Sequence, residues 1–233
     1  MQLPASMTKV KLIKRYKRFL ADVEFTDGTI ETAHCANTGS MSGLTDPGLP
    51  VWVWKSDNPN RKLSWSLELV GLESGLVGIN TSRPNQLVAE ALKNKKITPL
   101  KDYSQIQPEV KYGEKSRIDF LLTEPGLPKC YVEVKNVHYS TRAGLAQFPD
   151  SATSRGARHL MEMSKMCQQG HRAATIYVVQ RTDCTEFSLC QENDPAYVSA
   201  FAEAKKNGVE SYIYSCAISP TELKLCSALA FSS

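Results

Sequence analysis

The stretch from residue 116 to residue 139 constrains the fold more than any other. Two apolar, β-prone runs, Ile118–Leu122 and Cys130–Val137, flank a turn rich in proline and glycine at Glu124–Pro128. Strand-like runs on both sides of such a turn predict a β-hairpin. A hairpin with two apolar strands needs cover from other elements, so the rest of the chain is expected to pack around it.

Three charged residues interrupt these apolar strands. With the turn centred near Gly126, antiparallel pairing places Asp119 opposite Glu133, because the two residues are equidistant from that centre. Directly opposed side chains share a sheet face with their Cβ atoms ~4.5–5.5 Å apart. Lys135, two residues beyond Glu133, points to the same face. Two carboxylates this close repel each other unless a cation or a shared proton offsets their charge. The hairpin therefore predicts a metal site.

The composition is that of a globular protein. The chain has 233 residues, of which 42% are apolar and 22% charged, enough for one large domain or two smaller ones. No apolar run approaches the ~18–20 residues that span a bilayer, and the first residues do not resemble a signal peptide. We therefore expect a cytoplasmic protein. The seven cysteines are odd in number and contain no C-x-x-C pair, which argues against disulfides and zinc.

Residues 10–81 predict an all-β module. Turn signals separate five extended runs, which are Val10–Phe25, Thr29–Cys35, Val51–Trp54, Leu63–Leu69 and Leu76–Ile79. Five short strands in this length suit a small closed barrel such as an OB-fold. Trp52 and Trp54 share a strand face, so we expect them to pack into the barrel together.

The pattern changes at Thr81–Pro84, where Ser and Thr followed by Pro predict the start of a helix. We accordingly divide the chain into a barrel domain, residues 1–82, and an α/β domain, residues 83–233. The predicted order in the second domain is α-β-β-β-α-β-α-β on a mixed sheet. Outside the hairpin, its elements are helices at Asn85–Lys95, Ser154–Gln169 and Asp194–Gly208, strands at Glu109–Tyr112, Ala174–Gln180 and Val209–Ile218, and a loop at Ser140–Ser154.

A divalent metal is the predicted ligand of the hairpin, because carboxylate oxygens suit Mg²⁺ or Mn²⁺. A metal between Asp119 and Glu133 would polarise a phosphate and activate water, and Lys135 would orient that water or offset transition-state charge. Glu90 borders the apolar stripe of the first predicted helix and is a fourth candidate. The alternative is a surface strand on which a glutamate and a lysine stand side by side.

Two further groups of residues suggest contact with phosphate. Arg155, His159 and Glu162 occupy positions i, i+4 and i+7 of the second predicted helix and share one face. That face is either solvated or directed at the same cleft, with Arg155 as a phosphate ligand. Residues 9–18 contain six Lys or Arg and no acid, which indicates either a phosphate-contacting surface or an edge strand whose lysines prevent aggregation.

Several stretches of the chain resemble the SfsA family, the sugar fermentation stimulation proteins. They are residues 12–23, 34–41, 117–122 and 132–137, together with Phe148-Pro149-Asp150, Arg155-Gly156 and His159-Leu160. The resemblance implies a five-stranded OB-like β-barrel followed by a mixed-sheet α/β domain of the PD-(D/E)XK nuclease type. It also implies DNA binding and a role in regulating sugar (maltose) utilisation in bacteria. At the matching positions it implies Glu90, Asp119, Glu133 and Lys135 as catalytic residues, the three acids being metal ligands.

The resemblance favours nucleic-acid binding by the basic block. A basic barrel strand that carries a tyrosine can follow phosphates and stack a base, and the loop at residues 37–43 supplies amide and hydroxyl donors for phosphate oxygens. The candidate nucleic-acid contacts are Lys14, Arg15, Tyr16, Lys17, Arg18, Asn37, Thr38, Ser40, Arg155 and His159.

Three functions are consistent with these patterns. The first is a DNA-binding protein with an Mg²⁺- or Mn²⁺-dependent phosphodiesterase site. The second is a DNA-binding transcriptional regulator that keeps the nuclease fold without cutting. The third is a scaffold for a small ligand or a protein, with the tryptophans lining a pocket. Cleavage of nucleic acid distinguishes the first function from the second.

Overall fold

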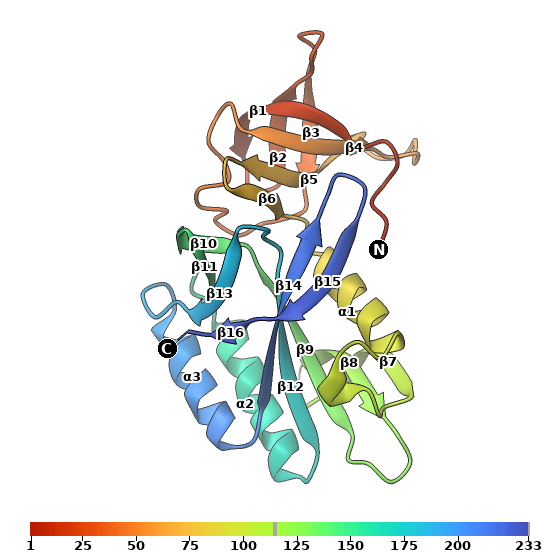
Figure 1. The fold of residues 1–233 in the computed structure, drawn as a ribbon, viewed down its shortest axis with the longest axis vertical. Helices are drawn as coiled ribbons and strands as arrows, with labels where there is room; N and C mark the ends of the chain where they lie inside the picture. The colour runs from red at the N-terminus through yellow and green to blue at the C-terminus, as the bar shows by residue number, and fades with distance from the viewer. Residues whose placement is uncertain (114–115, 233) are drawn as a thin grey trace.

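Six N-terminal strands form one sheet in the computed structural model, which describes residues 1–113 and 116–232 (Figure 1). They are β1 Thr8–Tyr16, β2 Leu20–Glu24, β3 Ile30–Cys35, β4 Pro50–Lys55, β5 Trp65–Leu72 and β6 Gly75–Gly78. The sheet order is β3-β2-β1-β4-β5-β6, and a parallel pairing of β3 with β5 closes the first five strands into a ring. The barrel is five-stranded, as predicted, but the run predicted as its fifth strand, Leu76–Ile79, corresponds to β6, which is a hairpin on β5 outside the ring.

The run Val10–Phe25, predicted as one extended stretch, is instead a hairpin of β1 and β2. The chain reverses at Lys17 and Arg18, whose φ angles are 47° and 66°. Side chains other than glycine seldom adopt positive φ, so a turn built from two basic residues gave no signal in the sequence.

The tryptophans of β4 do not enter the barrel, so that prediction was wrong. Val51 and Val53 are fully buried in the barrel core, while Trp52 and Trp54 alternate with them on the outer face. Trp52 packs against the core of the second domain, and Trp54 Nε1 donates to Glu68 Oε2 at 2.9 Å. Trp52 therefore belongs to the contact between the domains, whereas Trp54 is bonded to the neighbouring strand β5 of the barrel.

The second domain is built on a six-stranded mixed sheet of order β15-β14-β12-β9-β8-β7. Its elements are α1 Arg83–Lys93, a 3₁₀ turn Thr98–Leu100, β7 Gln105–Tyr112, β8 Ser116–Thr123, β9 Cys130–Val137, α2 Ser154–Gln168, β12 Arg172–Val179, α3 Pro195–Lys206, β14 Glu210–Ile218 and β15 Leu223–Ala228. A second sheet contains β10 Tyr139–Arg142, β11 Gly144–Phe148, β13 Cys184–Leu189 and β16 Ala230–Phe231. The predicted loop at Ser140–Ser154 thus holds two strands, and β13, β15 and β16 were not predicted.

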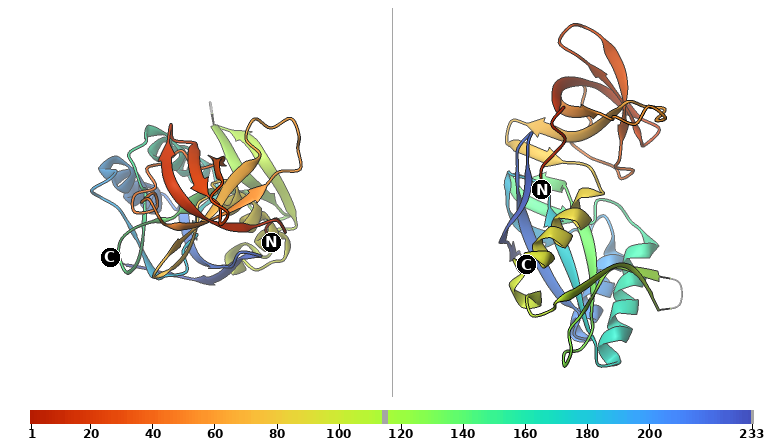
Figure 2. Two further views of the ribbon diagram at one scale, coloured as in Figure 1. Left: turned by 90° about the horizontal axis from the view of Figure 1, so that it is seen from above. Right: turned by 90° about the vertical axis from the view of Figure 1, so that its right-hand side faces the viewer.

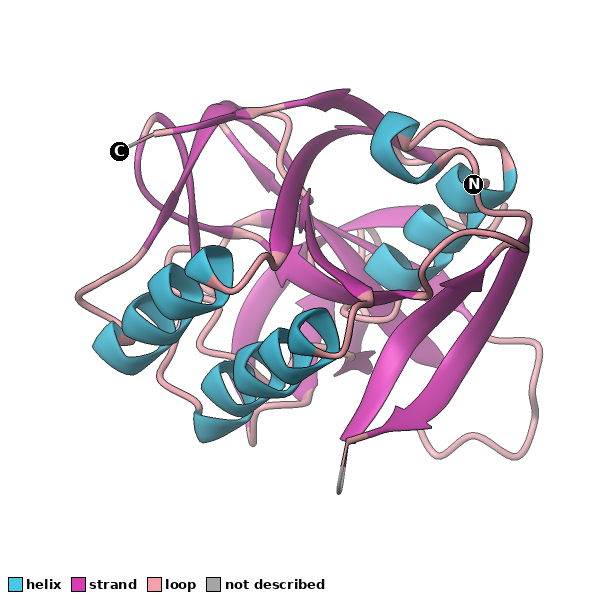
Figure 3. Ribbon diagram, turned by 90° about the horizontal axis from the view of Figure 1, so that it is seen from below, coloured by secondary structure: helices cyan, strands magenta, loops and turns pink. Residues whose placement is uncertain are grey.

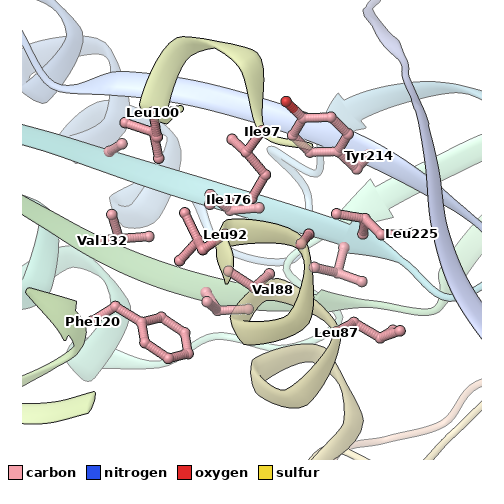
Figure 4. Close-up of a cluster of buried hydrophobic side chains, with 14 of the residues drawn as sticks. Leu87, Val88, Leu92, Ile97, Leu100, Phe120, Val132, Ile176, Tyr214 and Leu225 are labelled. Carbon is pink, nitrogen blue, oxygen red and sulfur yellow. The ribbon is translucent and has the colours of Figure 1, made fainter. Parts of the chain in front are cut away.

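Helices cover both faces of the large sheet (Figures 2 and 3). On one face, α1 directs Leu87, Val88 and Leu92 onto Val132 of β9 and Ile176 of β12 (Figure 4). On the other face, α2 and α3 lie side by side over a second apolar cluster. In the described part of the chain, no helix is both long enough and apolar enough to cross a membrane.

A buried ion pair joins the two domains. Glu68 of β5 is fully buried and accepts hydrogen bonds from Arg83, Trp54 and Asn80. Since Arg83 is the first residue of α1, the pair fixes the start of this helix against the barrel. The first turn of α1, which carries Asn85, is held in place from the barrel side.

Candidate metal centre

The β8–β9 hairpin has the predicted register. Its ladder pairs Phe120 with Val132, Leu121 with Tyr131 and Leu122 with Cys130. The turn is closed by the Leu127 N–H, which donates to the Glu124 carbonyl at 3.1 Å, and Gly126 takes a φ of 83°. Asp119 and Glu133 are the next residues along this register, one step beyond the last paired residues.

The side chain of Asp119 takes over where the ladder stops. Its Oδ2 accepts the Val134 N–H at 2.7 Å, and its Oδ1 accepts from Asn85 Nδ2 at 2.8 Å. The carboxylate therefore occupies a position that a strand carbonyl would take in a continuing ladder. The main-chain pairing of β8 with β9 therefore ends here, and Asp119 and Glu133 are the first residues beyond it.

Glu133 is 5% exposed and is held through one oxygen only. Its Oε1 accepts from Lys135 Nζ at 2.8 Å and from His159 Nδ1 at 2.7 Å. Arg155 Nε donates to His159 Nε2 at 3.4 Å, which places the ring proton of His159 on Nδ1. The other carboxylate oxygen, Oε2, is buried and has no hydrogen-bond partner among the residues that the structure describes.

The two carboxyl groups have opposed electrostatics. Burial raises the pKa of Asp119, and the nearby charge of Glu133 adds to the effect, despite the hydrogen bonds from Val134 and Asn85. Burial also opposes ionisation of Glu133, but the hydrogen bond from His159 and the charge of Lys135 outweigh it, so the pKa of Glu133 is lowered. Pairs of acids whose environments separate their pKa values are typical of sites that bind a cation or move a proton.

The face of α2 that carries Arg155, His159 and Glu162 is turned toward the hairpin rather than toward solvent. His159 and Glu162 are 3% and 8% exposed, while Arg155 is exposed at the beginning of the helix. Gly156 permits this placement, because a Cβ there would come 2.9 Å from the ring of Tyr197.

Glu90 is not brought to this cluster. It is exposed on α1, and its Oε2 lies 3.0 Å from the amino group of Met1. The residue of α1 that reaches Asp119 is Asn85, in the first turn. A neutral amide in a helical turn belongs to no charge pattern, so Asn85 could not be selected from the sequence alone.

The donor set fits a hard divalent cation. Each oxygen of Asp119 accepts one hydrogen bond and keeps a lone pair, and Glu133 Oε2 has no partner in the described part of the chain. Within residues 1–113 and 116–232, no three His, Cys, Asp or Glu side chains are grouped as a ready metal site. Asp119 and Glu133 would therefore hold the ion together with water and phosphate oxygens, as is usual for Mg²⁺.

In the barrel, two arginines of the basic block bind the protein's own main chain. Arg15 donates to the carbonyl oxygens of Arg18, Asn37, Gly39 and Ser40 at 2.6–3.3 Å, and Arg18 Nε donates to the Thr38 carbonyl at 2.9 Å. These bonds tie the β1–β2 turn to the loop at residues 37–40. We name this unit the arginine clamp, consisting of Arg15, Arg18 and residues 37–40.

Asn37 lies inside the protein, at the contact between the domains. It is 1% exposed, and its Nδ2 lies 3.4 Å from His138 Nε2 of the second domain. The adjacent Gly39 packs so closely on Asp150 that a Cβ there would come 2.5 Å from Asp150 Oδ2. Asn37 therefore anchors the loop and is not presented to solvent.

The other predicted contacts of the barrel lie at its surface. Lys14 and Tyr16 both reach Asp22, at 3.5 Å and 3.0 Å, and the Lys14 ammonium lies 5.2 Å from the centre of the Tyr16 ring. Lys17, Thr38 and Ser40 are exposed. Thr38 and Ser40 thus expose their side chains from within the arginine clamp, and Lys17 is exposed beside it.

Family models match almost the whole chain. The model described as the SfsA N-terminal OB domain matches residues 13–79, and the sugar fermentation stimulation protein RE domain matches residues 82–222. The fold resembles the SfsA of Pyrococcus furiosus, with a TM-score of 0.89 at 22% identity, covering 100% of this chain and 98% of that one.

Two curated relatives are similar in sequence to this chain over most of their length. A sugar fermentation stimulation protein homolog of Chelativorans sp. (strain BNC1) is 52% identical over 219 residues, 94% of each chain. The homolog of Agrobacterium fabrum is 50% identical over 214 residues, 92% of this chain and 90% of that one. The chain therefore belongs to the SfsA family, the sugar fermentation stimulation proteins.

Proposed function

We propose that this protein binds DNA and hydrolyses phosphodiester bonds at the Asp119–Glu133 centre with the help of Mg²⁺ or Mn²⁺. The observation that carries the proposal is the pair of carboxylates at the separation of β8 and β9, one of which has a buried oxygen without a partner. In support, the fold relative from Pyrococcus furiosus is a complex with Ca²⁺, and Ca²⁺ takes the same class of oxygen ligands.

Each side chain of the centre has a distinct task in this proposal. The bound cation supplies a Lewis acid for the phosphate and for water. Asp119 and Glu133 hold it, and Asn85 and the Val134 N–H keep the Asp119 carboxylate oriented. Lys135, 2.8 Å from Glu133 Oε1, offers its ammonium to the attacking water or to the charge that develops on the phosphate.

His159 and Arg155 complete the wall of the centre. His159 donates to Glu133 and keeps it ionised, and Arg155 at the exposed start of α2 is positioned to bind a neighbouring phosphate. In the reaction, water oxygen forms a bond to phosphorus while the bond from phosphorus to one bridging oxygen breaks. The products are a phosphate monoester and a free hydroxyl.

The barrel provides the second part of the DNA contact. Lys14 and Lys17 supply positive charge, and Thr38 and Ser40 supply hydroxyl donors beside it. Such contacts are largely independent of base sequence and weaken with salt, because lysines displace counterions from the phosphates. A role in regulating sugar utilisation, which the family's name suggests, would operate through this binding.

The test is a cleavage assay on single- and double-stranded DNA with Mg²⁺ or Mn²⁺, comparing wild type with Asp119→Ala. Asp119→Ala removes a proposed metal ligand, and the loss of transition-state stabilisation by the metal is expected to lower the rate by ~10²-fold or more. Asp102→Asn, an exposed acid outside the centre, is the matched control and keeps the wild-type rate.

Equal rates for wild type and Asp119→Ala would contradict the catalytic proposal. If both proteins then still bound DNA with a steep salt dependence, the second function, a DNA-binding regulator that does not cut, would take its place.

A further inference from the structure

The loop at residues 37–40 of the barrel rests on His138, which belongs to the second domain. His138 follows the last residue of β9 and is 5% exposed. Its Nε2 lies 3.4 Å from Asn37 Nδ2, and its Nδ1 lies 3.2 Å from Asn136 Nδ2. The ring is thus held between one amide group of the barrel and one of its own domain.

The same loop also rests on Asp150, in the segment that leads into α2. Ser40 Oγ donates to the Asp150 carbonyl at 3.5 Å. A Cβ on Gly39 would come 2.5 Å from Asp150 Oδ2 and 3.1 Å from Asn37 Oδ1, so a larger residue does not fit there unless the loop moves. We name His138 and Asp150 the loop seat.

The loop seat is held by close packing rather than by an ion pair. Asp150 Oδ2 lies 3.6 Å from His138 Nε2. Burial lowers the pKa of His138 against the charge of Asp150, and the charges of Arg181 and Arg15 lower it further. In addition, a charged imidazole has no lone pair with which to accept from the amide groups on either side. The uncharged ring makes only a weak electrostatic contact with Asp150.

The loop seat lies between the barrel and the candidate metal centre. His138 comes five residues after Glu133 of β9, a distance of ~17 Å at ~3.3 Å per residue. Asp150 precedes α2, whose first turn carries the exposed Arg155. Duplex DNA rises ~3.4 Å per base pair, so ~5 base pairs span this distance. A single DNA molecule is therefore long enough to contact the loop and the metal centre together.

We propose that the loop seat positions the barrel so that one DNA molecule contacts the loop at residues 37–40 and the metal centre at the same time. This role rests on the proposed function, and it makes DNA that spans both domains the substrate. Linked contacts strengthen each other only where the geometry permits both at once. Displacing the loop from its seat should therefore weaken the binding of long DNA and leave the metal centre intact.

The experiment is a titration of the full chain with a fluorescent duplex of ~20 base pairs in the presence of a chelator, so that binding is measured without cleavage. Gly39→Ala is expected to weaken binding by ~10-fold, because the added methyl group collides with Asp150. Asp150→Ala alone should change the affinity by less than about twofold, and the double variant, in which the shorter side chain makes room, should regain most of the wild-type affinity. Ser42→Ala, at an exposed neighbouring position, is the control and keeps the wild-type affinity.

Hydrolysis of bis(p-nitrophenyl) phosphate with Mn²⁺ provides a second readout, since this small diester is too short to reach the barrel from the metal centre. Its kcat and KM should be the same for wild type and Gly39→Ala, whereas the KM for the long duplex should rise in the variant. Thermal unfolding should show that every variant is folded at the temperature of the assay.

The loop seat and the proposed function fail in different ways. Wild-type affinity in Gly39→Ala, or a loss that Asp150→Ala does not repair, would overturn the positioning role and leave the proposed function in place. An equal loss of activity on the small diester would also overturn it, because the damage would then reach the metal centre. If wild type binds the duplex but cleaves no DNA, the catalytic proposal fails, and the titration still decides the role of the loop seat. Absence of DNA binding by wild type would overturn both.

Discussion

The barrel and the hairpin of the second domain use their charged residues in opposite ways. In the barrel, Arg15 and Arg18 donate to main-chain carbonyls of the loop at residues 37–40, although Arg15 Nε is buried without a partner among the described residues. In the hairpin, Asp119 and Glu133 keep free acceptor capacity although they are mostly buried. A run of charge in a sequence therefore does not by itself mark a binding site. Unused acceptor capacity on a buried, ionised acid that faces another acid is the more specific sign of a cation site.

The largest change in the cleavage rate is expected when Lys135 of the hairpin is replaced. Lys135→Met keeps the length of the side chain and removes the ammonium beside Glu133, and cleavage should fall by ~10²-fold or more. Circular dichroism should show an unchanged fold. A variant that retains the wild-type rate would remove Lys135 from the reaction.

In the barrel, replacing an arginine of the clamp should change the stability of the protein. Arg15→Met breaks several charged hydrogen bonds to carbonyls and should lower the free energy of unfolding by about 2–3 kcal/mol, measured with urea. Lys17→Met, at an exposed neighbouring position, should leave stability unchanged and reduce the salt dependence of DNA binding by about one unit in the log–log slope. If the two variants behaved alike, the distinction between clamp and surface would be wrong.

The pH dependence of stability should distinguish the two acids by sign. Asp119 has a raised pKa in the folded protein, so its ionisation disfavours folding. Asp119→Asn should therefore gain stability relative to wild type as the pH rises above the ordinary value of 3.8.

Glu133 has a lowered pKa, so it stabilises the fold above its ordinary value of 4.5 and loses that contribution as the pH falls through the lowered value. Glu133→Gln should accordingly lose stability relative to wild type at higher pH. Urea midpoints measured in a chelator across this range should move in opposite directions for the two variants. Parallel trends would contradict the opposed electrostatics.

The smallest changes in the cleavage rate are expected for substitutions in α1. Asn85→Ala removes one hydrogen bond to Asp119, and the cleavage rate should fall several-fold, in line with about 1 kcal/mol. Glu90→Gln should change the rate by less than twofold, since Glu90 forms an ion pair with the Met1 amino group and does not contact the metal centre. A larger loss for Glu90→Gln than for Asn85→Ala would restore Glu90 as a ligand.

Local patterns predicted the parts of the fold that depend on neighbours in sequence. The hairpin register was accessible because a turn at Gly126 determines which residues oppose each other. The three helices were accessible from start and stop signals, although the predicted Ser/Thr cap of α1 makes no side-chain hydrogen bond. The turn at Lys17 and Arg18 was not, because positive φ in basic residues leaves no sequence signal.

The same distinction applies to the candidate site. Asp119, Glu133 and Lys135 lie on one hairpin, so spacing alone grouped them. The contacts of Asn85 and His159 with the hairpin depend on how α1 and α2 pack against the sheet. These contacts join residues far apart in the sequence, so they could not be predicted without the packing of the helices on the sheet. The role of Asn37 changed for the same reason, since burial between the domains is a property of the packing.

The arginine clamp has a consequence for the direction of the main chain. In a trans peptide the C=O and the following N–H point in opposite directions. Because the carbonyls of Asn37, Gly39 and Ser40 point to Arg15, the N–H groups of Thr38, Ser40 and Met41 point away from it. Arg15 thus aligns three amide dipoles with their positive ends directed away from its guanidinium group, and this alignment depends on the main chain rather than on the side chains of Thr38, Ser40 and Met41.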